Sequence, residues 1–376
     1  MILSQEQQMI RDSVRSFAAE RLAPNAARWD RECTFPRDAL DEMAAMGLFG
    51  VTIPEQWGGA GLDYVSLALT LEEIAAGDGA TSTIASVQTL VCNIFNGYAS
   101  DAQKSEFLKP LAQGKLLGCF CLTEPHTGSD ASAITTRAER QGDHYVLNGV
   151  KQFITSGKNA DVAVVFAVTD KVAGKKGISA LVVPTDTPGY VVTRIEEKLG
   201  QHASDTAQIA LESCRVPVSN LLGAEGAGYR IALSNLEGGR ICIAAQAVGM
   251  ARAAFEAALR YAHERSTFGK PIIEHQAVNF RLADMATQIE AARQLVWHAA
   301  TLRDAGRPCL KEASMAKLFA SEAVEKVCSD AIQIHGGYGY LADFPVERIY
   351  RDARVCQIYE GASDIQRMVI GRALAD

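Results

Sequence analysis

The apolar residues of the chain are spaced in three different ways along its length. Residues 1–115 follow a helical pattern, in which Ser4 with Gln7 and Ser100 with Gln103 have the spacing of capping boxes that begin helices. From about residue 116 to 222, short β-branched or aromatic runs are separated by turn residues, which is typical of strands. Residues 223–376 return to a helical pattern.

The middle zone predicts six or seven short strands. The runs that carry this prediction are residues 116–122, 144–147, 162–168, 178–183, 191–195 and 206–211. The dipeptide Asn148-Gly149 lies between two such runs and predicts a hairpin turn. Short strands with regularly spaced turns favour a small β barrel or sandwich.

The last zone contains two long apolar stripes that step by three and four residues. The stripes are Val278, Leu282, Met285, Ile289, Ala292, Val296 and Ala299, and then Ala316, Ala320, Val324, Val327, Ala331 and Ile334. The first stripe predicts a helix of about 25 residues, roughly 37 Å long at 1.5 Å per residue. Two such helices predict a bundle, and their small residues allow close packing in an oligomer.

These patterns predict an α+β protein of three domains. We expect a helical domain over residues 1–115, a β domain over 116–222 and a helical bundle over 223–376. Of the 376 residues, 48% are hydrophobic and 22% are charged, which excludes a disordered chain. The net charge of −7 lacks the basic field of a nucleic-acid-binding protein, so we expect no nucleic-acid partner.

Several sequence patterns that are absent from the chain narrow the possible class of protein. No run of eighteen apolar residues occurs, which predicts no membrane span. The N-terminal residues lack a secretory pattern, and the nine cysteines are an odd number without a CxxC pair. We therefore expect free thiols, no metal site and a bacterial cytoplasmic protein, or a mitochondrial matrix protein in a processed form. Neither the dinucleotide-binding fingerprint GxGxxG nor the P-loop motif GxxxxGKS/T is present.

Three segments are candidate cofactor loops, each with an ordinary structural alternative. The first, residues 121–130 (CLTEPHTGSD), offers hydroxyls and exposed amides to an oxygen-rich ligand, or is simply a turn between strands. The second, residues 333–341 (QIHGGYGYL), has more glycines than a helix C-cap needs. The third, residues 265–269 (RSTFG), contains Arg265, which either binds a phosphate or faces the C-terminal end of a helix.

A fourth segment, residues 359–366 (YEGASDIQ), contains a candidate general base. Ser363 and Gln366 have the spacing of a capping box, so the final helix is expected to start near Asp364. Glu360 then lies in the preceding loop, where its side chain can enter a cavity. A carboxylate in an apolar pocket has a raised pKa and can act as a base, whereas the usual position of a glutamate is in solvent.

In this order and spacing, the four segments resemble the acyl-CoA dehydrogenase family over essentially the whole chain. Both family signatures can be read, as residues 121–133 (CLTEPHTGSDASA) and 333–352 (QIHGGYGYLADFPVERIYRD), the second with Arg348 and Asp352 at the expected spacing. The resemblance implies the acyl-CoA dehydrogenase-like fold, with an N-terminal helical domain, a middle β-barrel domain and a C-terminal helical bundle.

The resemblance also implies the reaction, which is the oxidation of an acyl-CoA to the trans-2-enoyl-CoA with FAD as the cofactor. Glu360 matches the base that takes the α proton, while a hydride leaves the β carbon for flavin N5. Hydrogen bonds to the thioester carbonyl stabilise the developing enolate. Electron-transferring flavoprotein is the implied electron acceptor, and a homotetramer is the implied assembly. The resemblance is to members that act on short, branched short or medium acyl chains, in fatty-acid or branched-chain amino-acid breakdown.

The resemblance assigns cofactor and substrate residues as well. Those expected to hold FAD, some of them from a neighbouring subunit, are Cys121, Leu122, Thr123, Gly128, Ser129, Phe153, Ile154, Thr155, Arg265, Ser266, Thr267, His275, Gln276, Gln333, Ile334, Gly336, Gly337, Ala362, Ser363 and Asp364. Those expected to contact the acyl-CoA are Ser129, Glu237, Arg240 and Gly361. Some members carry the base at the position of Gly239, which leaves Glu360 as the only base here.

The chain departs from the usual family pattern at Thr127, Phe153, Ala362 and the pair Gln201-His202, and none of these changes removes a catalytic group. Two rival functions remain. One is a flavin oxidase or monooxygenase on the same scaffold, which Glu360 and the chain length oppose. The other is a non-catalytic acyl-CoA-binding scaffold, which the retained base and cofactor residues oppose.

Overall fold

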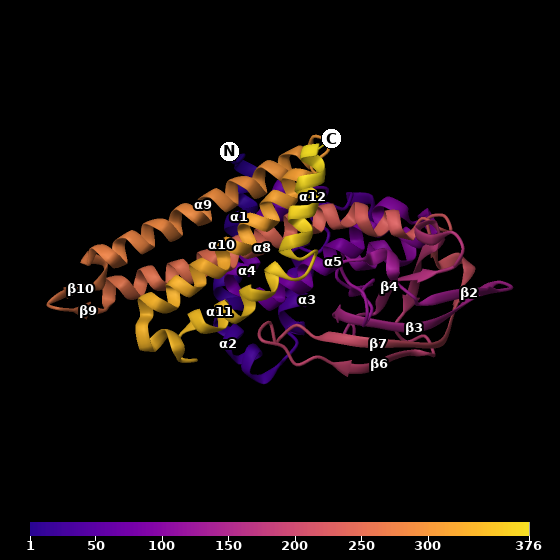
Figure 1. Ribbon diagram of the computed structural model, residues 1–376, viewed down its shortest axis with the longest axis horizontal. Helices are drawn as coiled ribbons and strands as arrows, with labels where there is room; N and C mark the ends of the chain where they lie inside the picture. Colours follow the sequence, from indigo (N-terminus) through magenta and orange to yellow (C-terminus); the bar gives the residue numbers. More distant parts are fainter. Residues whose placement is uncertain (376) are drawn as a thin grey trace.

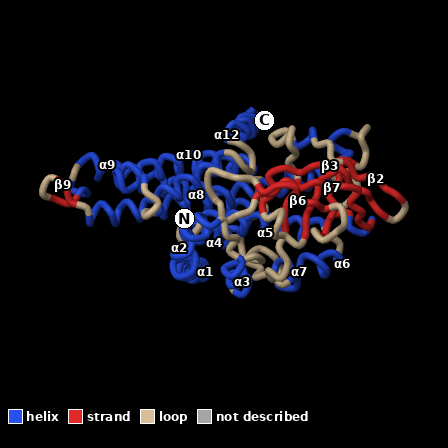
Figure 2. The backbone as a smooth tube through the Cα atoms, turned by 90° about the horizontal axis from the view of Figure 1, so that it is seen from below, coloured by secondary structure: helices blue, strands red, loops and turns tan. Residues whose placement is uncertain are grey.

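A computed structural model describes residues 1–375 of the chain. Figures 1 and 2 show an elongated molecule with a β sheet at one end and long helices that extend to the other end. The order of elements is helices, then strands, then helices, which confirms the predicted α+β arrangement. The domain bounds 1–115, 116–222 and 223–376 stay a prediction.

The N-terminal part is helical. Its principal helices are α1 (Gln5–Phe17), α2 (Ala23–Glu32), α3 (Arg37–Ala45), α4 (Tyr64–Gly77), α5 (Gly79–Tyr98), α6 (Asp101–Gln103) and α7 (Lys109–Ala112). Both predicted capping boxes are present, at Ser4 with Gln7 before α1 and at Ser100 with Gln103 before α6. Helices α4 and α5 are buried along nearly their whole length and pack against the C-terminal helices. They therefore form the wall between the N-terminal part and the bundle.

The middle part forms one sheet of eight strands within the described residues. The strands are β1 (Gly118–Cys121), β2 (Arg137–Gln141), β3 (His144–Thr155), β4 (Val162–Val168), β5 (Ile178–Pro184), β6 (Tyr190–Ile195), β7 (Thr206–Pro217) and β8 (Leu221–Leu222). Their order is β6-β7-β3-β2-β4-β5-β8, with β1 added in parallel beside β4. Alternate residues of β4 enter two different apolar cores, so both faces of the sheet are covered there.

The predicted hairpin at Asn148-Gly149 is wrong. Both residues lie inside the continuous strand β3, at a bulge in its pairing with β7. A Cβ atom on Gly149 would come within 2.4 Å of the Thr136 Oγ1, so the glycine serves a close approach of two backbones. The turn between β2 and β3 instead falls after Gln141, which pairs with His144.

The C-terminal part consists of three long and two short helices. They are α8 (Gly228–Glu264), α9 (Gln276–Asp304), α10 (Leu310–His335), α11 (Pro345–Ala353) and α12 (Ser363–Ala375). Nearly all residues of the two predicted stripes are buried on α9 and α10, which confirms those helices. The 37-residue helix α8 has no comparable stripe, because most of its residues are buried on more than one side.

Two further features of this bundle concern the membrane-span prediction and the connection between α8 and α9. Helix α8 is long and apolar enough to cross a membrane, but 78% of its most apolar window is buried inside the protein, as in the core helix of a globular fold. The two-residue strands β9 (Ser266–Thr267) and β10 (Lys270–Pro271) join α8 to α9 at the tip of the bundle. This tip is the point farthest from the sheet in both views.

Candidate active site

Glu360 lies in a short loop between α11 and α12, and its carboxylate is directed against α8. The backbone of Glu360 is left-handed, with φ 54°, and that of Gly361 is also left-handed, with φ 91°. A Cβ atom on Gly239 of α8 would come within 2.7 Å of the Glu360 Oε2. Any side chain at position 239 would therefore displace the carboxylate, and glycine is the residue that admits it.

The electrostatic surroundings of Glu360 suit a general base. Burial raises the pKa of Glu360 to about 7, although the positive charges of Arg240 and Lys317 act in the opposite direction. Burial also lowers the pKa of Lys317 to about 8 and lowers that of Arg240. A carboxyl group with a pKa near neutrality can take up and release a proton at working pH.

The capping box predicted at Ser363 and Gln366 is not formed. Helix α12 starts at Ser363, and the Gln366 Nε2 donates to the backbone oxygens of Glu360, at 3.1 Å, and Gly361, at 2.8 Å. The Ser363 Oγ and Gln366 Oε1 have no hydrogen-bond partner among residues 1–375. Gln366 therefore stabilises the loop that carries Glu360 rather than the amide groups of the helix.

A buried ion pair fixes the loop that follows β1. The Lys151 Nζ donates to the Glu124 Oε1 at 2.8 Å and to the Leu122 oxygen at 3.0 Å. Burial alone would raise the pKa of Glu124, but Lys151 and the hydrogen bonds from Thr135 and Thr136 lower it to about 2. The loop is thus fixed against the end of β3.

The structure brings together the predicted cofactor residues of β1 and β3. The group comprises Cys121, Leu122, Thr123, Gly128 and Ser129 with Phe153, Ile154 and Thr155. The Gln152 amide donates to the Thr123 oxygen at 2.8 Å, which joins the two stretches. Phe153 has φ 60° and is 62% exposed, so an aromatic ring is presented to the outside by a strained backbone.

A second group of predicted cofactor residues lies at the opposite end of the molecule. Its members, at β9, the start of α9 and the end of α10, are Arg265, Ser266, Thr267, His275, Gln276, Gln333, Ile334, Gly336 and Gly337. Arg265, Thr267 and both glycines line a cavity of about 530 Å³. In Figure 1 the β9–β10 tip and the sheet lie at the two ends of the long axis, so one chain cannot place both groups on one small molecule.

The remaining predicted residues lie around the base and along α8. Gly361, Ala362, Ser363 and Asp364 follow Glu360 into α12. Arg240 is 7% exposed, whereas Glu237 is half-buried and forms an ion pair with Arg303 at 3.2 Å. Arg240 thus lies in the interior near the base rather than at the surface, and its contact with CoA stays a prediction.

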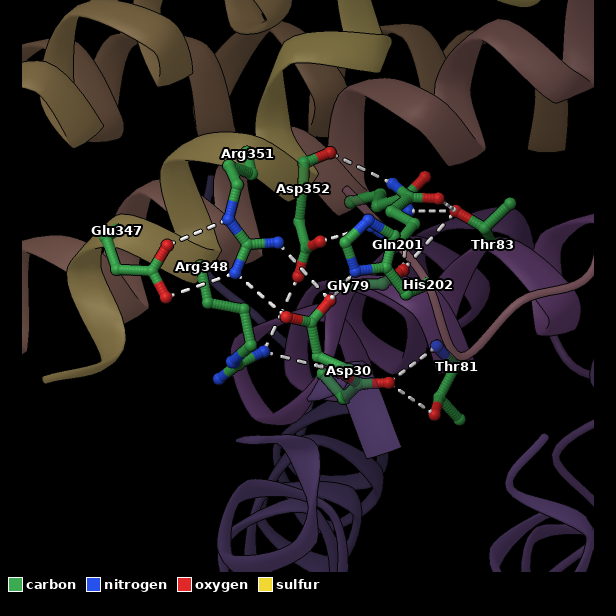
Figure 3. A network of polar contacts seen from close by, with 12 residues as sticks. Asp30, Gly79, Thr81, Thr83, Gln201, His202, Glu347, Arg348, Arg351 and Asp352 are labelled. Carbon is green, nitrogen blue, oxygen red and sulfur yellow. Dashed lines mark hydrogen bonds and ion pairs between the residues drawn. The ribbon is translucent and has the colours of Figure 1, made fainter. Parts of the chain in front are cut away.

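A network of polar contacts connects the N-terminal, middle and C-terminal parts of the chain (Figure 3). Asp352 accepts a hydrogen bond from the Gln201 amide and lies 3.5 Å from Arg348, which also contacts Asp78. Beside it, Asp30 forms ion pairs with His202 and Arg351. Gln201 and His202, which depart from the usual family pattern, therefore fasten the β6–β7 loop to the C-terminal signature.

The sequence analysis missed two groups at the base. The first is Lys317, which lies on the buried face of α10 among alanines. A signal for it existed, because its spacing from Ala313 and Ala320 puts a lysine on the apolar stripe of that helix. The second is Tyr359, whose hydroxyl donates to the Gln246 Oε1 on α8 at 2.7 Å. The sequence gives no sign that these two residues meet.

The comparisons with known proteins agree with this fold. The N-terminal, middle and C-terminal domains of acyl-CoA dehydrogenases match residues 4–115, 119–214 and 226–375. The three matched domains define the class of the protein as an acyl-CoA dehydrogenase. The chain belongs to the acyl-CoA dehydrogenase family, whose members are FAD enzymes.

Similar proteins cover the chain from end to end. An acyl-CoA dehydrogenase of Bacillus subtilis is 48% identical over 100% of this chain and 99% of its own length. The mitochondrial short-chain specific acyl-CoA dehydrogenase of Rattus norvegicus is 46% identical over 98% of this chain and 90% of its own. The structure of butyryl-CoA dehydrogenase from Megasphaera elsdenii superposes with a TM-score of 0.98 at 41% identity and covers both chains completely.

Proposed function

We propose that this protein is an FAD-dependent dehydrogenase that converts a short-chain acyl-CoA to the trans-2-enoyl-CoA, with Glu360 as the base. The observation that carries the proposal is the enclosed Glu360 carboxylate, for which Gly239 leaves room and whose pKa lies near 7. A base must be ionised in a substantial fraction of molecules at working pH and still bind a proton well, and a pKa near 7 meets both conditions.

Residues of the chain itself account for the proton transfer. The Glu360 carboxylate takes the proton from the α carbon of the thioester. Arg240 and Lys317 stabilise the carboxylate before transfer, while burial favours the protonated form afterwards. The burial that raises the pKa of Glu360 would also strengthen hydrogen bonds to the thioester oxygen as enolate charge develops.

FAD, when bound, supplies the acceptor for the β hydrogen. The residues fit this cofactor in two places. Phe153 and the Thr123–Ser129 loop present an aromatic ring, hydroxyls and amides at the sheet. At the tip, Cβ atoms built on Gly336 and Gly337 meet no atom of the described chain within 4 Å, and Arg265 lies beside this open space. Glycines that leave such space suit close contact with a phosphate.

Because the two places lie at opposite ends of one chain, we infer that a second copy of the chain completes each cofactor site. The groups at the sheet of one subunit would bind the flavin end, and those at the tip of its neighbour would bind the remainder. The homotetramer implied by the family is consistent with this sharing. We propose electron-transferring flavoprotein as the electron acceptor, and a cytoplasmic or mitochondrial matrix location, in keeping with the bacterial and mitochondrial relatives.

A short acyl chain is favoured by the relatives and by polar contacts next to the base. Tyr359 donates to Gln246, and the Gln246 Nε2 donates to the Thr83 Oγ1 at 2.5 Å, which ties the base loop to α8 and α5. A long acyl chain that passed between these elements would break the bonds. Each buried polar group left without a partner costs about 1–3 kcal/mol.

An anaerobic titration of the purified protein tests the proposal. The flavin absorbance is followed during addition of butyryl-, isobutyryl-, octanoyl- and palmitoyl-CoA. We expect fast bleaching by butyryl-CoA and little by palmitoyl-CoA. A yellow protein that no acyl-CoA bleaches would refute the reaction, and a colourless one that takes up no FAD would refute the cofactor. Preferential bleaching by isobutyryl- or octanoyl-CoA would retain the reaction and correct the chain class.

The Glu360→Gln variant tests the base. The amide has nearly the same shape as the carboxylate but accepts no proton at neutral pH. We expect the variant to retain FAD and to bind butyryl-CoA, but to lose flavin reduction by at least about 100-fold. Reduction at the wild-type rate would show that another group takes the α proton.

A further inference from the structure

Lys317 is a buried lysine, and no acidic side chain among residues 1–375 contacts its ammonium group directly. It lies on α10 on the buried face that contains Ala313, Ala316 and Ala320, and its own exposed fraction is 0%. The structure gives its Nζ one hydrogen bond, to the backbone oxygen of Gly361 at 2.7 Å. Burying an ammonium group is unfavourable unless its interactions compensate, so this single contact and the nearby charges must account for its place.

The carbonyl that Lys317 binds belongs to the loop that carries the base. Glu360 and Gly361 are both left-handed, and this conformation is unfavourable for a residue with a side chain. Such a backbone persists only where its surroundings hold it. Two side chains hold it here, because Lys317 and Gln366 both donate to the Gly361 oxygen and Gln366 also donates to that of Glu360.

We propose that Lys317 is a positioning residue for the base: it holds the Gly361 carbonyl so that the Glu360 carboxylate stays against Gly239. The positive charge of Lys317 also favours the ionised form of that carboxylate. The proposal rests on the dehydrogenase function proposed above. It assigns Lys317 two separable effects, one through geometry and one through charge.

The charged and titratable groups around Lys317 and Glu360 come from α8 and from the segment that precedes the base loop. Arg240 on α8 is the other positive charge that acts on Glu360, and Cys356, which precedes the base loop, acts on Lys317. Cys242 on α8 faces the carboxylate as well, and burial raises the pKa of its thiol to about 12, so it stays neutral. Arg240 and Lys317 are therefore the groups whose charge sets the ionisation of Glu360 at neutral pH.

The sign of the charge effect follows from this arrangement. Removal of the Lys317 charge disfavours the carboxylate and raises the pKa of Glu360. Because the carboxylate is the active form, the acidic limb of the rate profile moves to higher pH. The geometric effect slows the reaction at every pH, because misplacing a reacting group by about 1 Å lowers a rate by about 100-fold.

The test uses the FAD-loaded protein and stopped-flow reduction by butyryl-CoA over a range of pH. In Lys317→Met both effects are lost, so we expect reduction to slow by about 10- to 100-fold and the acidic limb to move to higher pH. In Lys317→Arg the charge remains, so the rate falls while the limb stays near that of the wild type. The matched control is Lys326→Met, which removes an exposed lysine from the same helix and should change neither.

FAD content and the Kd for butyryl-CoA are measured alongside and should change by less than about threefold, at the low end of single-interaction effects. If Lys317→Met does not fold, Lys317→Arg and Gln366→Leu decide the matter. Gln366→Leu removes an uncharged hydrogen-bond donor to the same loop, so it should slow flavin reduction without moving the acidic limb of the pH profile.

The proposal would be overturned if the folded Lys317 variants had the wild-type rate of flavin reduction and the wild-type acidic limb of the pH profile. A shift of the acidic limb in Gln366→Leu would overturn it as well. These outcomes differ from a failure of the proposed function, in which the wild-type protein itself is not reduced by any acyl-CoA.

Discussion

The buried ion pair between Glu124 and Lys151 permits a quantitative prediction. Lys151 is fully buried and Glu124 nearly so, and the Lys151 Nζ lies 2.8 Å from the Glu124 Oε1. Substitution of Lys151 by Met retains the length of the side chain but leaves the carboxylate without its cation. Hydrogen bonds from Thr135 and Thr136 remain, so the carboxylate is not entirely without partners.

The magnitude follows from the pKa of Glu124. A decrease from 4.5 to about 2 corresponds to about 3 kcal/mol of stabilisation of the ionised form in the folded protein, which Lys151 and the hydrogen bonds from Thr135 and Thr136 supply together. Breaking a buried pair by removing one partner typically costs about 3–5 kcal/mol, and the remaining hydrogen bonds place this pair at the low end of that range. We therefore expect Lys151→Met to lower the free energy of unfolding by about 3 kcal/mol and the Tm by about 4 °C.

The pH dependence has a definite sign. The pKa of Glu124 is lower in the folded than in the unfolded protein, so its stabilising contribution is complete above about pH 5 and declines as the pH falls towards 2. The difference in Tm between the wild type and Lys151→Met should therefore shrink from pH 7 to pH 3. FAD retention should also fall, because Lys151 holds the oxygen of Leu122 in the predicted cofactor loop.

Thermal melting followed by circular dichroism is the assay, with Lys158→Met as the control for an exposed lysine in the turn that follows β3. The double variant Glu124→Gln with Lys151→Met should recover part of the lost stability, because a neutral amide needs no cation. A Tm of Lys151→Met within about 1 °C of the wild type at pH 7 would refute the reasoning, since about 3 kcal/mol could not then be stored in this pair.

Three further predictions concern Glu360. Since the pKa of Glu360 is about 7 and the carboxylate is the active form, flavin reduction by butyryl-CoA should fall about tenfold per pH unit below pH 7, and a rate that is flat down to pH 5 would contradict the assignment. The same raised pKa makes the ionised form destabilising above pH 7, so Glu360→Gln should raise the Tm at pH 8 and leave it nearly unchanged at pH 4. Gly239→Ala places a Cβ atom 2.7 Å from the Glu360 Oε2 and should slow reduction by about 100-fold with FAD content retained. The control is Gly97→Ala, whose Cβ atom meets no described atom within 4 Å and which should not slow reduction. Equal reduction rates in these two variants would show that the carboxylate has room to move.

Local patterns in the sequence predicted those elements whose stability is local. The stripes of α9 and α10 are buried on one side each, so their apolar residues recur with the helical period. The capping boxes at Ser4 and Ser100 depend on residues only three positions apart. In contrast, α8 is surrounded by other elements, and its Gly249 lets the backbone of α4 approach, so no stripe marks the longest helix.

The errors arose where a local motif serves a distant contact. Asn148-Gly149 is a hairpin motif by composition, but Gly149 exists for its approach to Thr136, and the chain continues as a strand. Ser363 and Gln366 have the spacing of a capping box, but the Gln366 amide binds the loop before the helix. In both cases a tertiary contact outweighs the local preference, which amounts to about 1 kcal/mol.

The sequence by itself determined the chemical groups of the site and their order along the chain, including a glutamate beside a glycine in the loop before the final helix. Only the tertiary structure decided which distant residues surround that glutamate. Gly239 and Arg240 come from α8 and Lys317 from α10, and together with burial they set the pKa of Glu360. A pKa depends on solvent exclusion and on charges within a few ångströms, and neither is encoded in the local sequence.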